Sequence, residues 1–413
     1  MNTQPLHLFD AFGIEMEYML VDRDTLNVRP IADTLLSILA GGRTVSDFES
    51  GPITWSNELA LHVLELKTTL PANKFLPLPS QFETAIRDLR PVLDRLNLRL
   101  LPTAMHPWMN PTIETILWPH ENHEIYQAYD RIFDCKRHGW SNVQSVHLNL
   151  PFHGDEEFAK LHAAVRLVLP LLPALAASSP IVDGHYTGQL DSRMQYYTDH
   201  CQAAPSLTGR IIPEPIYDEA TYRREVYDPI RHDIARHDIE GVLEVDFLNA
   251  RGAIARFDRG SIEFRVMDVQ EYPAADVAIC VAVTSVVKSL VQEQSSTLAT
   301  QQSIPTEVLR SALNLASDRA EHAVVNDTNY LASLGIHESA CSAGDIWQKL
   351  LGRVRKSDPS IANLYAPLEI IQEHGTLATR ICRSLGKNFD RSDLHNVYDQ
   401  LADCLVTWEP FQP

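Results

Sequence analysis

The stretch FGIEMEYML, residues 12–20, decides the fold because polar and apolar side chains alternate along it. A period of two is typical of a β-strand with one buried face. Gly13, Glu15 and Glu17 would share one face, with apolar residues filling the other. Two carboxylates one pleat apart repel each other unless a cation lies between them, and Mg²⁺ prefers such oxygen ligands. The alternative is an acidic strand that faces solvent, and the stretch taken alone favours that alternative.

Three later stretches repeat the alternation and carry further polar side chains. Glu65 lies on the polar face of VLELKT, and His147 lies on that of SVHLNLPF. Glu263 and Arg265 share a face of RGSIEFRVMDVQ. A lone histidine on a strand is more often structural than a ligand, but polar neighbours on both sides of His147 favour a ligand. An ion pair with Glu263 is the alternative reading of Arg265.

Glu58 lies seven residues before Glu65, which is an odd spacing. The two carboxylates can therefore share a site only if a bend or bulge lies between them. Arg193 lies in a stretch rich in Gly, Pro, Tyr and Asp, residues 181–215, which we expect to form a long irregular loop. The histidines of HENHE, residues 120–124, lack the HExxH spacing of a zinc protease and are predicted to be surface residues.

These patterns predict an α+β fold in which helices cover the apolar face of one antiparallel sheet and the polar face stays open. The chain shows no linker or repeat, so we expect a single catalytic domain over residues 1–413. The sheet and the motifs would occupy residues 1–291, and residues 292–413 would be mostly helical. The other predicted helices span residues 31–40, 81–96, 156–177 and 274–291.

Composition restricts the function. The net charge of -19 and the absence of a Lys/Arg-rich run argue against a nucleic-acid partner. The six cysteines form no CxxC pair, which favours a reducing compartment. The first ten residues do not resemble a signal peptide, and the most apolar runs, residues 167–177 and 277–287, are too short to cross a bilayer. We therefore expect a cytoplasmic protein without a membrane partner; the oligomeric state, a homo-oligomer included, stays open.

A carboxylate-lined face without cations is costly, whereas Mg²⁺ or Mn²⁺ ions would relieve the repulsion and hold a polyphosphate. Neither a Walker A pattern nor GxGxxG is present, so a nucleotide would be held through the metal ions.

The chain resembles the glutamate–cysteine ligase family, in particular its bacterial carboxylate–amine ligase branch. The stretches that carry the resemblance occur in family order over residues 12–291: GIEMEY, NELALHVLELKT, TAMHP, SVHLNL, LAASSP with Arg193 after it, and RGSIEFRVMDVQ. The resemblance implies a glutamine-synthetase-type fold, a curved antiparallel sheet with a funnel-shaped active site. It also implies that ATP phosphorylates the side-chain carboxylate of glutamate and that an amine then attacks the acyl phosphate, as in glutathione biosynthesis.

On the family pattern, Arg265 would stabilise the transferring phosphoryl group and Arg193 would bind a substrate carboxylate. Metal ligands would be Glu15, Glu17, Glu58, Glu65, His147 and Glu263, the last also assigned to catalysis. The branch usually shows a tryptophan after the long helix, but residues 313–330 here contain none. We expect that segment to shape the acceptor-amine pocket, so acceptors other than cysteine stay open. A metal-dependent hydrolase and an inactive binding protein with this fold are the remaining alternatives.

Overall fold

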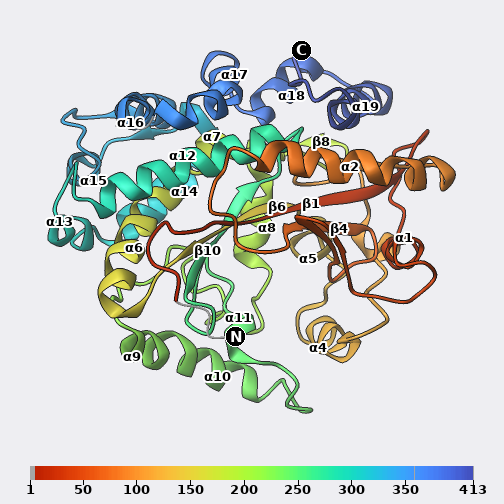
Figure 1. The fold of residues 1–413 in the computed structure, drawn as a ribbon, viewed down its shortest axis with the longest axis horizontal. Helices are drawn as coiled ribbons and strands as arrows, with labels where there is room; N and C mark the ends of the chain where they lie inside the picture. The colour runs from red at the N-terminus through yellow and green to blue at the C-terminus, as the bar shows by residue number, and fades with distance from the viewer. Residues whose placement is uncertain (1–4, 358, 413) are drawn as a thin grey trace.

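An eight-stranded antiparallel sheet forms the centre of the molecule in the computed structural model, which describes residues 5–357 and 359–412 (Figure 1). Seven strands follow the order β2-β3-β4-β1-β6-β10-β9, and β5 also pairs with β1. The strands are β1 (Gly13–Asp22), β2 (Asp47–Ser50), β3 (Ile53–Asn57), β4 (Val63–Thr68), β5 (Leu98–Leu101), β6 (Ser145–Pro151), β9 (Ala253–Arg256) and β10 (Ser261–Asp268).

The predicted strand around Glu15 is β1, and it lies in the middle of the sheet. It pairs with β4 on one side and with β6 on the other, so that Glu15 is opposite both Lys67 and His147. Glu17 is opposite Glu65. Three stretches that are far apart in the sequence thus bring their polar residues to one face of the sheet, because paired residues point to the same side.

Helices pack over the apolar face of the sheet, as predicted. Ile14, Met16, Tyr18 and Leu20 of β1 are fully buried in the main core. The helices α2 and α12 run across this face, and the C-terminal helices lie outside them (Figure 1). The layers on this side include α2 (Leu78–Arg95), α6 (Gly154–Val168), α7 (Pro173–Ala176), α12 (Pro273–Val291), α14 (Thr306–Arg319), α16 (Ala343–Ser357), α17 (Ala366–His374), α18 (Leu377–Leu385) and α19 (Arg391–Thr407).

The polar face is covered rather than open, which corrects the expectation of an exposed face. Short helices and their connections lie below the sheet in Figure 1. They include α4 (His123–Phe133), α5 (His138–Ser141), α8 (Ser192–Asp199), α9 (Glu219–Tyr222), α10 (Asp228–Ala235) and α11 (Val245–Leu248). As a result Glu17 and Glu263 are only 8% and 6% exposed. The remaining short elements are α1 (Ala32–Leu39), α3 (Pro111–Glu114), α13 (Leu298–Gln302), α15 (Thr328–Ser333), β7 (Ile181–Val182), β8 (His185–Tyr186), β11 (Val324–Val325) and β12 (Cys341–Ser342).

Three predicted elements differ from the structure. Residues 53–69 form two antiparallel strands, and Glu58 lies just after β3, where the chain reverses, so no bend within one strand is needed. The helix predicted over residues 156–177 is interrupted after Val168, because Pro170 and Pro173 lack the N–H that a continuous helix requires. The segment 181–215 is not a plain loop, since Arg193 lies in the first turn of α8.

A β-bulge in β10 changes which side chains face the site. Phe264 is opposite Leu148 and Met267 is opposite Val146, so two residues of β10 face one residue of β6. The extra residue shifts the alternation by one position. Asp268, which strict alternation would place on the apolar face, is therefore opposite Ser145 on the same face as Glu263.

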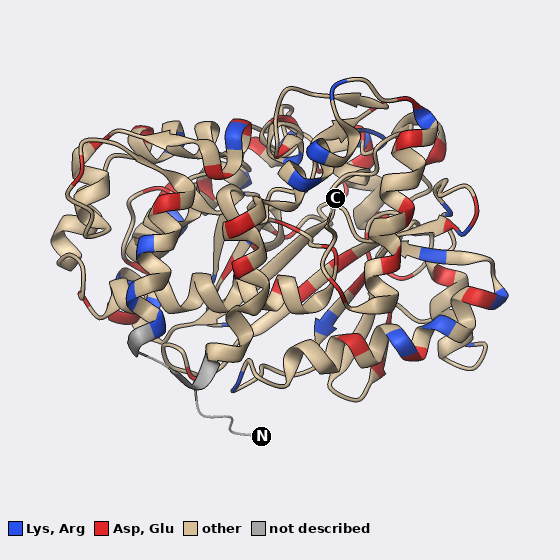
Figure 2. Cartoon of the chain, turned by 90° about the horizontal axis from the view of Figure 1, so that it is seen from above, with Lys and Arg blue, Asp and Glu red and all other residues tan. Residues whose placement is uncertain are grey.

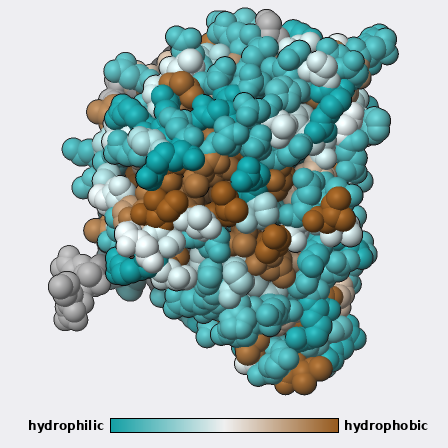
Figure 3. All heavy atoms as spheres, turned by 90° about the vertical axis from the view of Figure 1, so that its right-hand side faces the viewer, coloured by the Kyte–Doolittle hydropathy of each residue, from teal (hydrophilic) through white to brown (hydrophobic). Residues whose placement is uncertain are grey.

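The helix α12 agrees with the helix predicted over residues 274–291, and it is longer than the apolar run 277–287 that was expected to be too short to cross a bilayer. By length and composition only, its 19 residues are long and apolar enough to cross a membrane. In the structure 72% of its most apolar 18-residue stretch is buried inside the fold, as in the core helix of a globular protein. Acidic and basic residues are interspersed around the periphery, and acidic positions also follow the central strands (Figure 2). The side seen in Figure 3 is mostly hydrophilic, with separate apolar patches.

Candidate active site

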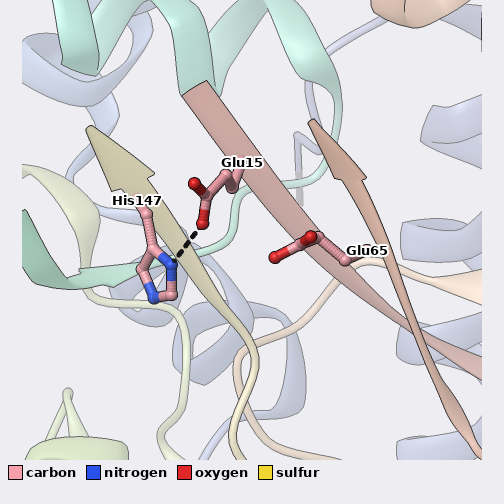
Figure 4. Close-up of side chains that lie close together, drawn as sticks. All are labelled: Glu15, Glu65 and His147. Atoms are coloured by element: carbon pink, nitrogen blue, oxygen red, sulfur yellow. Dashed lines mark hydrogen bonds and ion pairs between the residues drawn. The ribbon is translucent and has the colours of Figure 1, made fainter. Parts of the chain in front are cut away.

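Three strands direct Glu15, Glu65 and His147 toward one point on the polar face of the sheet (Figure 4). The Nδ1 atom of His147 lies 3.0 Å from Oε2 of Glu15, within hydrogen-bond distance. Asn149 donates from Nδ2 to the other carboxylate oxygen of Glu15 at 3.3 Å. Nζ of Lys67 lies 3.1 Å from Oε1 of Glu65, which is two residues earlier on the same face of β4. Glu15 is thus held by side chains of the neighbouring strand β6, and Glu65 by a side chain of its own strand.

Glu17 is fixed by the first residue of β6. Ser145 donates its backbone N–H to Oε2 of Glu17 at 2.7 Å and its hydroxyl to the same oxygen at 3.1 Å. The Ser145 hydroxyl also lies 3.0 Å from Nε2 of His147. The ring of His147 is therefore bonded at both nitrogens, to Glu15 on one side and Ser145 on the other.

Burial and mutual repulsion disturb the titration of this cluster. Burial, with the charge of Glu17, raises the pKa of Glu58 to about 7. Burial, with the charges of Glu15 and Glu58, raises the pKa of Glu65 well above its usual value. Burial opposes protonation of His147, but its hydrogen bond to Glu15 and the charge of Glu17 outweigh burial and raise its pKa to about 9. Additional positive charge at this place would relieve the repulsion.

Two groups of ligand atoms among the described residues have the spacing that a metal ion requires. Glu15, Glu65 and His147 form one group, and Glu17, Glu58 and Glu65 form the other. In each group the ligand atoms lie within 4.8 Å of one another. The carboxylate oxygens suit Mg²⁺ or Mn²⁺, and the imidazole of His147 would add one nitrogen ligand. Five of the six predicted ligands thus converge, with Glu65 common to both groups.

The sixth predicted ligand, Glu263, lies between cationic side chains instead. Its Oε1 is 3.3 Å from Nε of Arg265 and 4.0 Å from Nδ1 of His147. Its Oε2 is 3.8 Å from Nη1 of Arg256. Arg265 is therefore close to the carboxylate cluster, as the sequence predicts, while Glu263 is outside both convergent groups.

Arg256, at the end of β9, is a site residue that the sequence reasoning missed. The residue is 6% exposed, yet its Nε and Nη2 atoms have no hydrogen-bond partner. Its guanidinium lies 4.6 Å from the ring centroid of Phe247, a residue that is 52% exposed. A buried guanidinium with free donors is costly unless an anion can bind to it. The alternation in AIARF just before the Glu263 strand was the available signal for Arg256.

Arg193 is almost wholly engaged within the protein. It is 1% exposed, and its Nε donates to Asp268 at 2.5 Å. Its Nη1 donates to the backbone oxygen of Arg265 at 3.3 Å, whereas its buried Nη2 has no partner. Only one nitrogen of Arg193 is thus free for the substrate carboxylate that the resemblance implies.

Two cavities meet at the carboxylate cluster. The smaller one, about 220 Å³, is lined by Arg193, by Glu17 and by aromatic rings from α4, α5 and α8. The larger one, about 580 Å³, is lined by Glu15, Glu65 and the cationic side chains Lys67, Arg256 and Arg259. The side chains that line both cavities are Glu58, His147, Phe247 and Arg265. A group could pass from a ligand in one cavity to a ligand in the other beside Arg265.

Gly13 borders the site directly, whereas residues 313–330, which were expected to shape the acceptor-amine pocket, do not. A Cβ atom at Gly13 would lie 3.1 Å from Cβ of Asn149, so Gly13 makes room for the side chain that holds Glu15 as well as lining the larger cavity. Residues 313–330 line neither of the two cavities in the described part of the chain. They support the site from behind instead, because the backbone oxygen of Ser317 accepts from N–H of Asp191, the N-cap of α8.

Comparison of the fold with solved structures identifies two similar ligases. The bifunctional glutathione synthetase from Pasteurella multocida aligns with a TM-score of 0.64 at 13% identity, over 97% of this chain and 53% of that chain. The glutamate–cysteine ligase from Francisella tularensis, solved in complex with AMP, aligns with a TM-score of 0.60 at 13% identity, over 98% of this chain and 91% of that one. These similarities show the fold, and they confirm the predicted α+β architecture.

Comparison of the sequence gives the family. An uncharacterized protein of Archaeoglobus fulgidus is 33% identical over 307 residues, which is 74% of this chain and 78% of the relative. A protein of Cupriavidus metallidurans described as "Putative glutamate--cysteine ligase 2" is 30% identical over 216 residues, 51% of this chain and 52% of the relative. The sequence profile of glutamate–cysteine ligase family 2 (GCS2) matches residues 11–400. The chain therefore belongs to glutamate–cysteine ligase family 2 and is a ligase.

Proposed function

We propose that this protein is an ATP-dependent carboxylate–amine ligase that joins the side-chain carboxylate of glutamate to an amine. The observation that carries the proposal is the meeting of two cavities of different character at Glu58, His147 and Arg265. The larger cavity is lined by Lys67, Arg256, Arg259 and Arg265 as well as by four glutamates, so it suits a nucleotide polyphosphate with its metal ions, and the smaller one suits the acid and the amine. Family membership and the AMP-bound neighbour support the use of ATP.

The arginines would bind and position the reacting groups. Arg256 and Arg259 line the larger cavity, where Nη2 of Arg256 has no partner and would bind a phosphate of ATP. The free Nη2 of Arg193 would bind the α-carboxylate of glutamate in the smaller cavity. Arg265, at the junction, would stabilise the charge on the phosphoryl group during its transfer. Glu263 would hold Arg265 in place through their ion pair.

Mg²⁺ or Mn²⁺, held by Glu15, Glu17, Glu58, Glu65 and His147, would neutralise charge on the polyphosphate. Arg193 would hold the α-carboxylate of glutamate and so place the side-chain carboxylate beside Arg265. The side-chain carboxylate accepts the γ-phosphoryl group and ADP leaves. The amine then attacks the acyl carbon of this acyl phosphate. Because phosphoryl transfer depends on alignment and charge neutralisation, the protein needs no covalent nucleophile of its own.

The cytoplasm is the proposed location, since the six cysteines are all free in the structure. The proposed partners are small-molecule substrates, and a role in glutathione biosynthesis would follow if cysteine were the acceptor.

The test is a panel of amines assayed for ADP release with glutamate, ATP and Mg²⁺, followed by mass analysis of the products. We expect ADP release to rise when acid and amine are both present, with formation of a glutamyl amide. A metal-dependent hydrolase would act without ATP. The proposal fails if no pair of acid and amine stimulates ADP release.

A further inference from the structure

The hydroxyl of Tyr197 is a buried donor without a partner at the smaller cavity. Tyr197 lines this cavity and is 7% exposed. Its Oη atom has no hydrogen-bond partner among the described residues. A buried polar atom that has lost its bonds to water costs free energy unless another group replaces them. An acceptor atom of a bound molecule would satisfy this hydroxyl.

A second unpartnered donor comes from the same face of α8. Arg193 and Tyr197 are four residues apart in this helix, so their side chains lie one turn apart on one face. Nη2 of Arg193 is also buried without a partner. Both residues line the smaller cavity, and neither lines the larger one. The two free donors therefore belong to the part of the site that lies away from the proposed nucleotide.

Contacts near both ends of α8 hold the helix in place. At its beginning, Asp191 accepts at Oδ1 from the backbone N–H of Met194 at 3.0 Å. Near its end, Gly139 of α5 lies so close that a Cβ atom there would be 2.6 Å from the backbone oxygen of Tyr196. The two donors are thus carried by a helix whose position is already fixed, which lowers the cost of ordering them around a ligand.

The hydroxyl of Tyr197 keeps its proton at neutral pH. Burial raises the pKa of Tyr197, and the positive charges of Arg265 and Arg193 oppose this rise without cancelling it. Because screening limits such an influence to short range, the hydroxyl lies near both guanidinium groups. A protonated phenol in these surroundings is suited to donate a hydrogen bond to an anion.

A carboxylate presents two oxygens, and Arg193 can serve one of them through Nη2. We propose that Tyr197 serves the other, so that Arg193 and Tyr197 together hold the α-carboxylate of the donor glutamate. The inference rests on the proposed function, in which Arg193 binds this carboxylate. Arg265 and the metal ions at Glu17 and Glu58 remain with the phosphates and the reacting side-chain carboxylate. Tyr197 is then a residue that selects acids with a carboxylate at this position.

The variant Tyr197→Phe tests the proposal, because it removes the hydroxyl and keeps the ring, which packs 4.6 Å from the ring of His200 in the main core. The assay is ADP release with ATP, Mg²⁺, glutamate and the best amine of the panel. We expect KM for glutamate to rise about tenfold or more, since a hydrogen bond to a charged group is lost. KM for ATP and for the amine should stay within about twofold.

The matched control is Tyr330→Phe, because the hydroxyl of Tyr330 is buried, donates to the backbone oxygen of Leu167 at 2.6 Å and lines neither cavity. The control should unfold at a lower urea concentration than wild type and keep its KM values. Tyr197→Phe should unfold at the same urea concentration as wild type, since its hydroxyl has no partner to lose. An unchanged KM for glutamate, or a rise in KM for the amine in its place, would overturn the inference. Absence of ADP release by wild type with every pair of acid and amine would instead refute the ligase.

Combining Tyr197→Phe with Arg193→Lys tests whether the two donors hold the same carboxylate. Two groups that bind one carboxylate are coupled, because the loss of either one misplaces the carboxylate for the other. We expect the loss of kcat/KM for glutamate in the double variant to be at least about threefold smaller than the product of the two single losses. Circular dichroism would verify that each variant is folded. Losses that multiply independently would assign Tyr197 to another group and overturn the inference, leaving the ligase intact.

Discussion

Arg256→Gln should weaken nucleotide binding while leaving the stability of the protein almost unchanged. The guanidinium of Arg256 is buried and its Nε and Nη2 atoms make no hydrogen bond, so its removal costs only the long ion pairs with Asp258 at 3.6 Å and Glu263 at 3.8 Å and the contact with the ring of Phe247. A hydrogen bond to a charged group is worth about 1.5–3 kcal/mol. If a phosphate of ATP takes one such bond, the substitution should weaken nucleotide affinity about tenfold to 150-fold, since about 1.4 kcal/mol corresponds to a factor of ten. The free energy of unfolding should stay within about 1 kcal/mol of wild type, because Glu263 retains Arg265.

The matched control is Arg166→Gln, because Arg166 is also buried but is fully hydrogen-bonded away from the site. Arg166 donates to Pro213 O at 2.9 Å, and to Tyr217 Oη and Thr306 Oγ1 at 3.0 Å each. Its loss should destabilise the protein by about 2–4 kcal/mol without changing nucleotide affinity. Calorimetric titration with ADP and Mg²⁺, together with urea unfolding, measures both quantities. An Arg256→Gln protein that is destabilised like the control and binds ADP like wild type would refute the reasoning.

Four further outcomes are expected. Glu15→Gln should abolish ADP release without changing the circular dichroism spectrum, because the apolar face of β1 is untouched; near-normal turnover would contradict the assignment. Chelation by EDTA should abolish ADP release and added Mg²⁺ should restore it, whereas activity that persists in EDTA would argue against a metal role. Arg380→Met should destabilise the protein by about 3–5 kcal/mol in urea unfolding, because it leaves buried Glu271 without its partner at 2.6 Å, and the double variant with Glu271→Leu should recover most of the loss. Burial lowers the pKa of His62 to about 4, so between about pH 6.5 and pH 4 the unfolded chain binds a proton at His62 and the folded chain does not. The free energy of unfolding should therefore fall by about 1.4 kcal/mol per pH unit as the pH drops through this range. His62→Gln should lack this pH-dependent loss in urea unfolding.

The strands with alternating residues were predictable because polar and apolar side chains take turns along each one and so define its two faces. The polar positions of β1, β4, β6 and β10 converge as the alternation predicts, since pairing in a sheet preserves which side a residue faces. Glu58 was harder to place, because whether a chain bends or reverses between two carboxylates depends on how neighbouring segments pack. Because the chain reverses after β3, Glu58 lies near Glu65, whereas alternation along a single strand would place the two residues on opposite faces.

The interactions of Arg193 could not be predicted from local patterns, and for Arg256 the alternation in AIARF indicates the face of the sheet but not the partners of the side chain. Arg193 meets Asp268 only because the bulge in β10 shifts the alternation, and a bulge of one residue leaves little trace in a single sequence. Arg256 lies at the end of β9, a strand of four residues, and its side chain contacts Phe247 and Glu263 from other segments. Such short elements are defined by tertiary packing more than by their own sequence.

The shared wall between the two cavities has a consequence for inhibitor design. Glu58, His147, Phe247 and Arg265 line both cavities, so ligands that fill the two spaces end next to each other. A single molecule that joined an adenosine phosphate to an acid through a short linker would hold its second half at a high effective concentration once the first half had bound. Such a compound should bind far more tightly than either fragment, and it should discriminate against ATP-binding proteins that lack an adjoining aromatic cavity.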